Sequence, residues 1–146
     1  MQLTFTPKQL SAEILAGVLN QAFIASTISE DSRGKQFVSI SLNGIQCNLK
    51  TLGNTLQFSS AIRIDNSESE ESVKKVVEHI NYEIIHAKHT KIDGEDSHFI
   101  THHYAHWIPE DETISAAYIV KLTRSFTAFL EKHLNRWNSL AQEALR

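Results

Sequence analysis

The sequence predicts an α+β fold in which amphipathic helices pack on one face of an antiparallel sheet. The main indications are two tight turns between residues 35 and 63 and the helical periodicity on either side of that segment. Asn43-Gly44 is a strong hairpin signal, because both central residues of such a turn must accept positive φ. Gly53-Asn54 marks a second turn. Together the two turns predict a three-stranded meander with one apolar face, and a slip of one residue would destroy that face.

The first turn sets a specific register between the first two strands. The expected partners are Leu42 with Ile45, Ile40 with Cys47 and Val38 with Leu49. The second turn independently selects the same face of the middle strand. Its expected pairs are Thr51 with Leu56, Leu49 with Phe58, Cys47 with Ser60 and Ile45 with Ile62.

An N-terminal helix is expected to open at Thr6. Thr6 and Gln9 have the spacing of a capping box, and Pro7 suits the first helical position. Phe5 and Leu10 have the spacing of a hydrophobic staple, and the apolar stripe continues from Leu10 to Ala22. Residues 23–29 either finish this helix or form a short edge strand.

The second half of the chain adds a helix, a hairpin and a final helix. The acidic segment 65–71 leads into helical spacing over 73–85. Segments 86–92 and 98–108 read as two strands joined by the loop 93–97. A long C-terminal helix follows Ile114-Ser115, with Asp111 and Thr113 as competing caps. The predicted order is therefore helix, three- to four-stranded antiparallel meander, helix, β-hairpin and long C-terminal helix.

Size and charge narrow the class of protein. The 146 residues fit one domain over 1–146, and the net charge of -3 argues against nucleic-acid binding. No apolar run is long enough for a spanning helix, and the N-terminal residues do not form a secretory signal. The single Cys47 falls on the predicted buried face, as a small core residue does. We expect a cytoplasmic protein that binds neither nucleic acid nor membrane.

Three further segments resemble a known family. Residues 77–82, Val-Glu-His-Ile-Asn-Tyr, resemble the end of the second helix in YbjN-type proteins, where an Asn ahead of a hairpin is typical. Residues 87–94 look like that family's strand and acidic turn. Ile114-Ser115-Ala116-Ala117, continuing into Leu122, Phe126 and Phe129, looks like the start of its final helix.

The element order is also that of class I type III secretion chaperones. The resemblance implies a small homodimer that holds an extended or partly helical segment of another protein and has no catalytic activity. Such domains serve as secretion chaperones, regulators or assembly factors. The chain departs from the pattern in the histidines of its second hairpin and in its longer, Trp-bearing last helix.

Eight histidines suggest an alternative function, a metal-binding or pH-responsive regulator. A zinc site would need His102 or His106 with a cross-strand partner such as His86, and a third ligand from elsewhere. No Cys pair or clear Glu partner supports such a site, so we expect no metal and no cofactor. The simplest interpretation is that the imidazoles lie exposed on a polar strand face.

The sequence carries no signature of an enzyme. It has no nucleophile elbow, phosphate loop or dinucleotide fingerprint. The side chains on the polar face of the meander are short and mostly uncharged, which suits either an ordinary solvated face or hydrogen bonding to a client protein. The expected function is thus a non-enzymatic, chaperone-like binding module. Its candidate client contacts are Phe37, Gln46, Asn48, Gln57 and Trp107, and its candidate self-association residues are Trp137 and Leu140.

Overall fold

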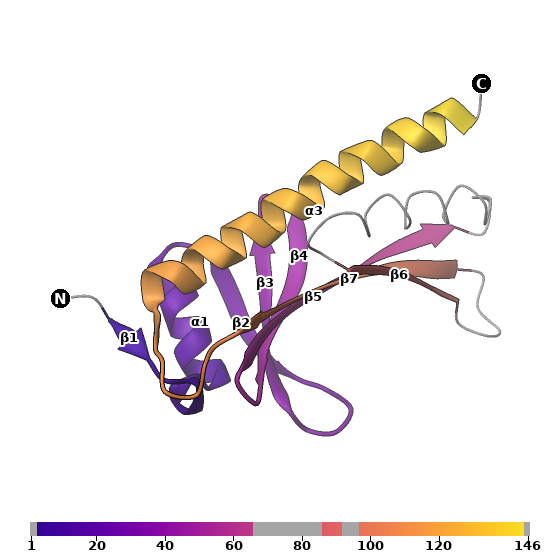
Figure 1. Cartoon of the computed structure of the whole chain (residues 1–146). Helices are drawn as coiled ribbons and strands as arrows, with labels where there is room; N and C mark the ends of the chain where they lie inside the picture. Colours follow the sequence, from indigo (N-terminus) through magenta and orange to yellow (C-terminus); the bar gives the residue numbers. More distant parts are fainter. Residues whose placement is uncertain (1–2, 66–85, 92–96, 145–146) are drawn as a thin grey trace. The chain divides into compact units, whose positions relative to one another are not determined.

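The protein is an α+β fold, seen in a computed structural model that describes residues 3–65, 86–91 and 97–144. The main sheet has the strand order β2-β3-β4-β5-β7-β6 (Figure 1). Strand β1 pairs separately with β8. The predicted fold class is confirmed, with four strands in the meander, while the helix expected over 73–85 lies outside the described residues. The elements are β1 (Thr4–Phe5), the 3-10 helix η1 (Pro7–Gln9), α1 (Ala12–Gln21), β2 (Ala25–Glu30), β3 (Gln36–Leu42), β4 (Ile45–Leu52), β5 (Thr55–Asp65), β6 (His86–Lys91), β7 (Ser97–Trp107), β8 (Ile114–Ser115) and α3 (Ala116–Ala144).

The chain divides into two compact units. The first comprises Met1–Phe58 and Ala105–Ala128, and the second comprises Ser59–Tyr104 and Phe129–Arg146. Strands β5 and β7 and helix α3 each contribute residues to both units. The single domain expected over residues 1–146 stays a prediction.

The first predicted turn and its register are confirmed. Leu42 pairs with Ile45, Ile40 with Cys47 and Val38 with Leu49. Asn43 and Gly44 have φ values of 53° and 79°, the left-handed conformations that a type I′ turn requires. The second turn lies where it was expected, since β4 ends at Leu52 and β5 begins at Thr55.

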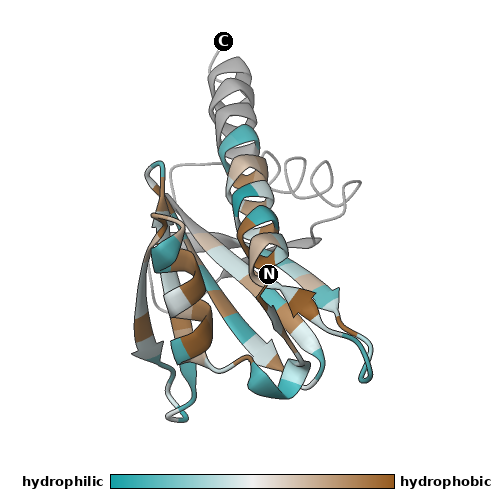
Figure 2. Ribbon diagram, turned by 90° about the vertical axis from the view of Figure 1, so that its left-hand side faces the viewer, coloured by the Kyte–Doolittle hydropathy of each residue, from teal (hydrophilic) through white to brown (hydrophobic). Residues whose placement is uncertain are grey.

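The core of the first unit lies on the apolar face of the meander. Val38, Ile40, Leu49 and Phe58 are each at most 2 % exposed. Helix α1 lies beside β2 and β3, and its apolar residues, brown in Figure 2, form a stripe along it. The Phe126 ring of α3 lies 5.5 Å from the Phe58 ring. The core residues contributed by α1 are Leu15, Ala16, Val18 and Leu19.

The expected start of the first helix was wrong. Thr6 and Gln9 do form the capping box, with the Thr6 N–H donating to Gln9 Oε1 at 2.8 Å, but it caps only the short η1. Helix α1 begins at Ala12, where the Ser11 hydroxyl oxygen accepts from the Ile14 N–H at 3.2 Å. A capping box satisfies a first turn whether or not an α-helix follows, so the signal located a turn and not the helix.

The ambiguous segment 23–29 turns out to contain an edge strand. Helix α1 ends in a Schellman motif, in which the Ile24 N–H donates to the Leu19 carbonyl at 2.9 Å and the Phe23 N–H to the Asn20 carbonyl at 3.1 Å. Phe23 takes the left-handed position of this motif, with φ 63°. The chain then enters β2, which pairs with β3 along its whole length.

The last helix begins where the sequence indicated. The Ser115 hydroxyl accepts from the Tyr118 N–H at 3.0 Å, so Ser115 is the cap rather than Asp111 or Thr113. Ile114 is buried. The helix α3 runs unbroken for 29 residues. At 1.5 Å per residue it is about 44 Å long.

Candidate functional site

The open face of the meander carries a shallow depression across β2, β3 and β4. Its volume is about 260 Å³. Strand alternation places Ser39, Ser41, Gln46 and Asn48 on this face, because Val38 and Leu49, the neighbours of Ser39 and Asn48, are buried on the other. All of the lining residues are uncharged: Ala25, Ser26, Thr27, Ser39, Ile40, Ser41, Gln46, Cys47 and Asn48.

The structure brings together only part of the predicted client-binding set. Gln46 and Asn48 line the depression. Phe37 lies half-buried at a position of the same face, paired with Ser29 of β2, but does not line the depression. Gln57 lies on β5, where its amide donates to the Thr55 hydroxyl at 3.3 Å.

Trp107 belongs to a different place in the first unit. It is 65 % exposed at the end of β7 and borders a separate cavity. It does not line the depression that contains Gln46 and Asn48. Trp137 and Leu140 are residues of α3 whose side chains lie outside the described part of the chain.

Strand β2 gives the depression an open border. It is the first strand in the order of the main sheet, so within the described residues only β3 pairs with it. Its sequence, Ala-Ser-Thr-Ile-Ser-Glu, has no Pro or Lys, residues that commonly block an edge against pairing. Among the described strands, β2 therefore has one edge with no neighbour.

A rigid corner precedes this edge strand. The Asn20 side chain donates to the Ser26 carbonyl at 3.2 Å and accepts from the Ser26 N–H at 3.1 Å. Arg124 Nη2 donates to the Ala22 carbonyl at 3.4 Å. The corner holds the Phe23 side chain 97 % exposed. Sequence reasoning missed this residue, because apolar periodicity alone gave no sign of its left-handed backbone.

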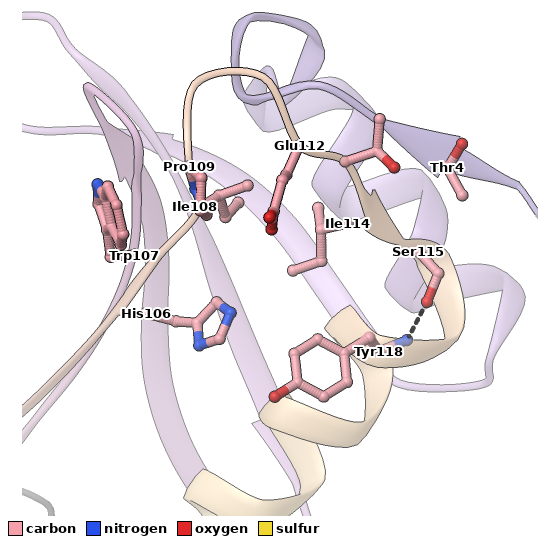
Figure 3. Close-up of a pocket in the computed structure, with 10 residues that line it drawn as sticks. Thr4, His106, Trp107, Ile108, Pro109, Glu112, Ile114, Ser115 and Tyr118 are labelled. Atoms are coloured by element: carbon pink, nitrogen blue, oxygen red, sulfur yellow. Dashed lines mark hydrogen bonds between the residues drawn. The ribbon is translucent and has the colours of Figure 1, made fainter.

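A larger cavity of about 550 Å³ lies between the end of β7 and the start of α3. The buried Ile108 and Ile114 line it, together with the rings of His106 and Tyr118. Those rings meet edge-on, with centroids 5.4 Å apart. Figure 3 shows the Glu112 carboxylate and both rings turned toward the same space.

The cavity depends on contacts distant in sequence. The strand β1 pairs with β8, matching Thr4 with Ser115 and Phe5 with Ile114. The Ile108 N–H donates to the Asn54 carbonyl at 2.7 Å, which fixes the end of β7 against the turn between β4 and β5. Strands of two residues give no recognisable alternation, so the sequence offered no signal for this site.

The histidine hairpin differs from the arrangement that a zinc site would need. The register of β6 and β7 pairs His86 with His103, and Ala87 with His102. Since residues of successive pairs alternate between the two faces, His86 and His102 belong to opposite faces. The cross-strand pair of His86 with His102, one of the two pairs that a zinc site would need, is therefore not formed.

The histidines of β7 also differ in exposure. His102 is fully buried, which corrects the expectation of an exposed imidazole, whereas His103 is exposed. Across residues 3–65, 86–91 and 97–144, no group of three His, Cys, Asp or Glu residues is placed to hold a metal ion.

A pH response of the histidine hairpin stays a prediction. It is tested by following the mass of the oligomer from pH 7.5 to 5.5.

Cys47 has no activated thiol. Its side chain is 3 % exposed within the core of the meander. Burial raises the pKa of this thiol to about 12, because the thiolate would lose its hydration. At neutral pH the group is a neutral core side chain and not a nucleophile.

The described residues form an α+β fold and include no evident catalytic constellation. No family model matches this chain, and no curated protein matches it. Among solved structures, it is similar to the crystal structure of YbjN from E. coli, a candidate transcription regulator. The identity is 12%, the TM-score is 0.54, and the alignment covers 92% of this chain and 91% of that one. The protein thus has a YbjN-like fold.

The described helices offer no candidate for crossing a membrane, since none combines the length and the apolar character that this requires.

Proposed function

We propose that this protein is a non-enzymatic binding module that holds a short extended segment of a client protein, as secretion chaperones, regulators and assembly factors do. The observation that supports the proposal best is the open edge of β2 beside an uncharged, hydrogen-bonding depression. Main-chain pairing along β2 supplies affinity, and the side chains on the adjacent face supply selectivity. The likeness to YbjN supports the fold on which this arrangement depends.

The polar contacts in this proposal come from Gln46 and Asn48. Both amides can donate and accept, so they can bond polar groups of the part of a client that lies over the depression, since a strand paired with β2 would itself lie about 14 Å from β4. Ser39 and Ser41 lie on the same face. The Ser39 hydroxyl lies 3.3 Å from the Ser29 hydroxyl, within hydrogen-bond distance. Phe37 provides an adjacent apolar contact. No covalent step is part of this function, and the expected location of the protein is the cytoplasm.

A site-specific cross-link tests the proposal. The photo-reactive residue p-benzoylphenylalanine replaces Asn48 in the full chain, and Glu13, an exposed residue of α1, in a control chain. After irradiation in native cells, the cross-linked segment is sequenced, synthesised and titrated against the purified protein by calorimetry. We expect one short segment cross-linked from position 48 but not from position 13, with 1:1 binding of the peptide.

Substitutions then locate the peptide on the depression. Gln46→Ala and Asn48→Ala should each weaken binding about fivefold, since a hydrogen bond contributes about 1 kcal/mol net. Gln36→Ala is the matched control, because Gln36 is an exposed amide at the start of β3 outside the depression. Equal cross-linking from both positions, or equal effects of all three substitutions, would contradict the proposal.

We also propose that the protein acts as a homodimer, with Trp137 and Leu140 of α3 in the contact. Light scattering of the purified chain should give twice the chain mass of 16.5 kDa. The double variant with Trp137→Ala and Leu140→Ala should have the mass of a single chain. A single-chain mass for the unaltered protein at micromolar concentration would contradict the dimer.

A further inference from the structure

We propose that the cavity between β7 and α3 is a second binding site, which takes a basic side chain of another polypeptide. It goes beyond the proposed function, because none of its lining residues belongs to the depression on β2, β3 and β4. Its volume, about 550 Å³, lies within the usual range for ligand sites. All of its lining residues belong to the first unit.

The cavity provides a surface for an apolar stem. Ile108 and Ile114 line it but are only 3 % and 4 % exposed, so the accessible apolar surface comes mainly from other lining residues, among them Trp107, which is 65 % exposed. Pro109 adds apolar surface beside Ile108 (Figure 3). The methylene groups of a lysine or arginine side chain pack well on such a surface while the charged end stays hydrated.

Two rings provide a site for the charged end. Tyr118 lies at the start of α3, where its backbone N–H donates to the capping Ser115 hydroxyl. It is 39 % exposed, and its ring centroid lies 5.4 Å from that of His106 at an interplanar angle of 64°. A cation placed over an aromatic face is attracted by the ring quadrupole, and arginine is the most frequent partner.

A carboxylate in the lining favours a cation, in opposition to the dipole of α3, whose N-terminal end borders the cavity and favours an anion. Glu112 contributes a carboxylate, and the described lining contains no Lys or Arg that could neutralise it. The Glu112 N–H donates to the Pro109 carbonyl at 2.9 Å, so a turn positions this residue at the cavity. Arginine suits the site best, because its guanidinium can bond a carboxylate and stack on a ring simultaneously. The overall charge of -3 favours the approach of a basic segment.

Paired peptides test this inference. One peptide has a central arginine between glycines with both ends capped, and the other has citrulline in its place, which keeps the shape and removes the charge. Each is titrated into the labelled full chain while amide resonances are followed by NMR. We expect millimolar binding of the arginine peptide, with shifts at His106, Glu112 and Tyr118, and at least threefold weaker binding of the citrulline peptide.

A matched pair of substitutions separates local from overall charge. Glu112→Gln should weaken binding of the arginine peptide two- to fivefold, as expected for a partly exposed ion pair. Glu110→Gln makes the same charge change at an exposed residue of the same turn that does not line the cavity, and it should leave binding unchanged. Tyr118→Leu should also weaken binding, without changing the fold as judged by the remaining resonances.

Three results would overturn the inference: no shifts at the cavity, equal binding of both peptides, or equal effects of Glu110→Gln and Glu112→Gln. Any of these leaves the client-segment proposal intact, since that proposal is tested at Gln46 and Asn48 with a different peptide. Conversely, if substitutions at Gln46 and Asn48 had no effect on client binding, the inference about this cavity would still stand.

Discussion

Replacing Phe58 with alanine should remove a large part of the stability of the first unit. The Phe58 side chain is 0 % exposed, and its ring lies 5.5 Å from the Phe126 ring at an angle of 36°. Truncating a buried phenylalanine to alanine costs about 3–5 kcal/mol. The total free energy of unfolding of a domain is about 5–15 kcal/mol, so this loss is a substantial fraction of it.

Urea unfolding followed by tryptophan fluorescence measures this loss. Phe23→Ala is the matched control, because the same truncation at a side chain that is 97 % exposed should change the free energy of unfolding by less than about 0.5 kcal/mol. If Phe58→Ala does not fold, Phe58→Leu keeps most of the volume and should cost about 1–2 kcal/mol.

A double-mutant cycle isolates the contact between the rings. Phe58→Ala and Phe126→Ala should together cost less than the sum of the single losses, by about 0.5–1.5 kcal/mol, the usual coupling of an aromatic pair. Two results would refute the reasoning that α3 closes the core over the meander. One is a loss of unfolding free energy for Phe58→Ala no larger than for Phe23→Ala, and the other is strict additivity of Phe58→Ala with Phe126→Ala.

Three further predictions concern single residues. Phe23→Gly should raise the free energy of unfolding by about 0.5–1 kcal/mol in a urea titration, because glycine accepts φ 63° without strain, and a decrease would contradict this account. Cys47, whose pKa is raised to about 12, should resist iodoacetamide at pH 8 in the folded protein and react once urea unfolds it; rapid labelling of the folded chain would show that the thiol is accessible. The Lys35 and Arg33 backbone N–H groups, each donating to Asp31 Oδ1 at 2.9 Å, hold the pKa of that carboxyl below its usual 3.8, so its stabilising effect is present above about pH 4 and disappears as the pH falls through the folded-state pKa. Asp31→Asn should remove this contribution to the pH dependence of the unfolding free energy. An unchanged profile of stability against pH in acid would contradict the role of Asp31.

The meander could be predicted because local rules and burial agreed. Asn43-Gly44 fixed one register through turn geometry, and Val38, Ile40 and Leu49 selected the same alignment through burial. A one-residue error would have violated both constraints together. The sequence offered three candidate caps for the last helix, Asp111, Thr113 and Ser115. The hydrogen bond that identifies Ser115 as the cap is visible only in the folded chain.

The candidate sites could be predicted only in part. Gln46 and Asn48 were found because strand alternation places them together on one face. Trp107 was grouped with them on chemistry alone, although it lies at another cavity. That cavity depends on the pairing of Thr4 with Ser115, a contact between the two chain segments of the first unit that no local pattern encodes.

The most direct test of the account is hydrogen exchange along β2 with and without the cross-linked client peptide. Pairing at the edge should protect the outward-facing amides of Ala25–Glu30, while amides of α1, which the peptide does not reach, should exchange at unchanged rates. Unchanged exchange along β2 under saturating peptide would show that this edge does not hold the client, and the proposed mode of binding would then be wrong.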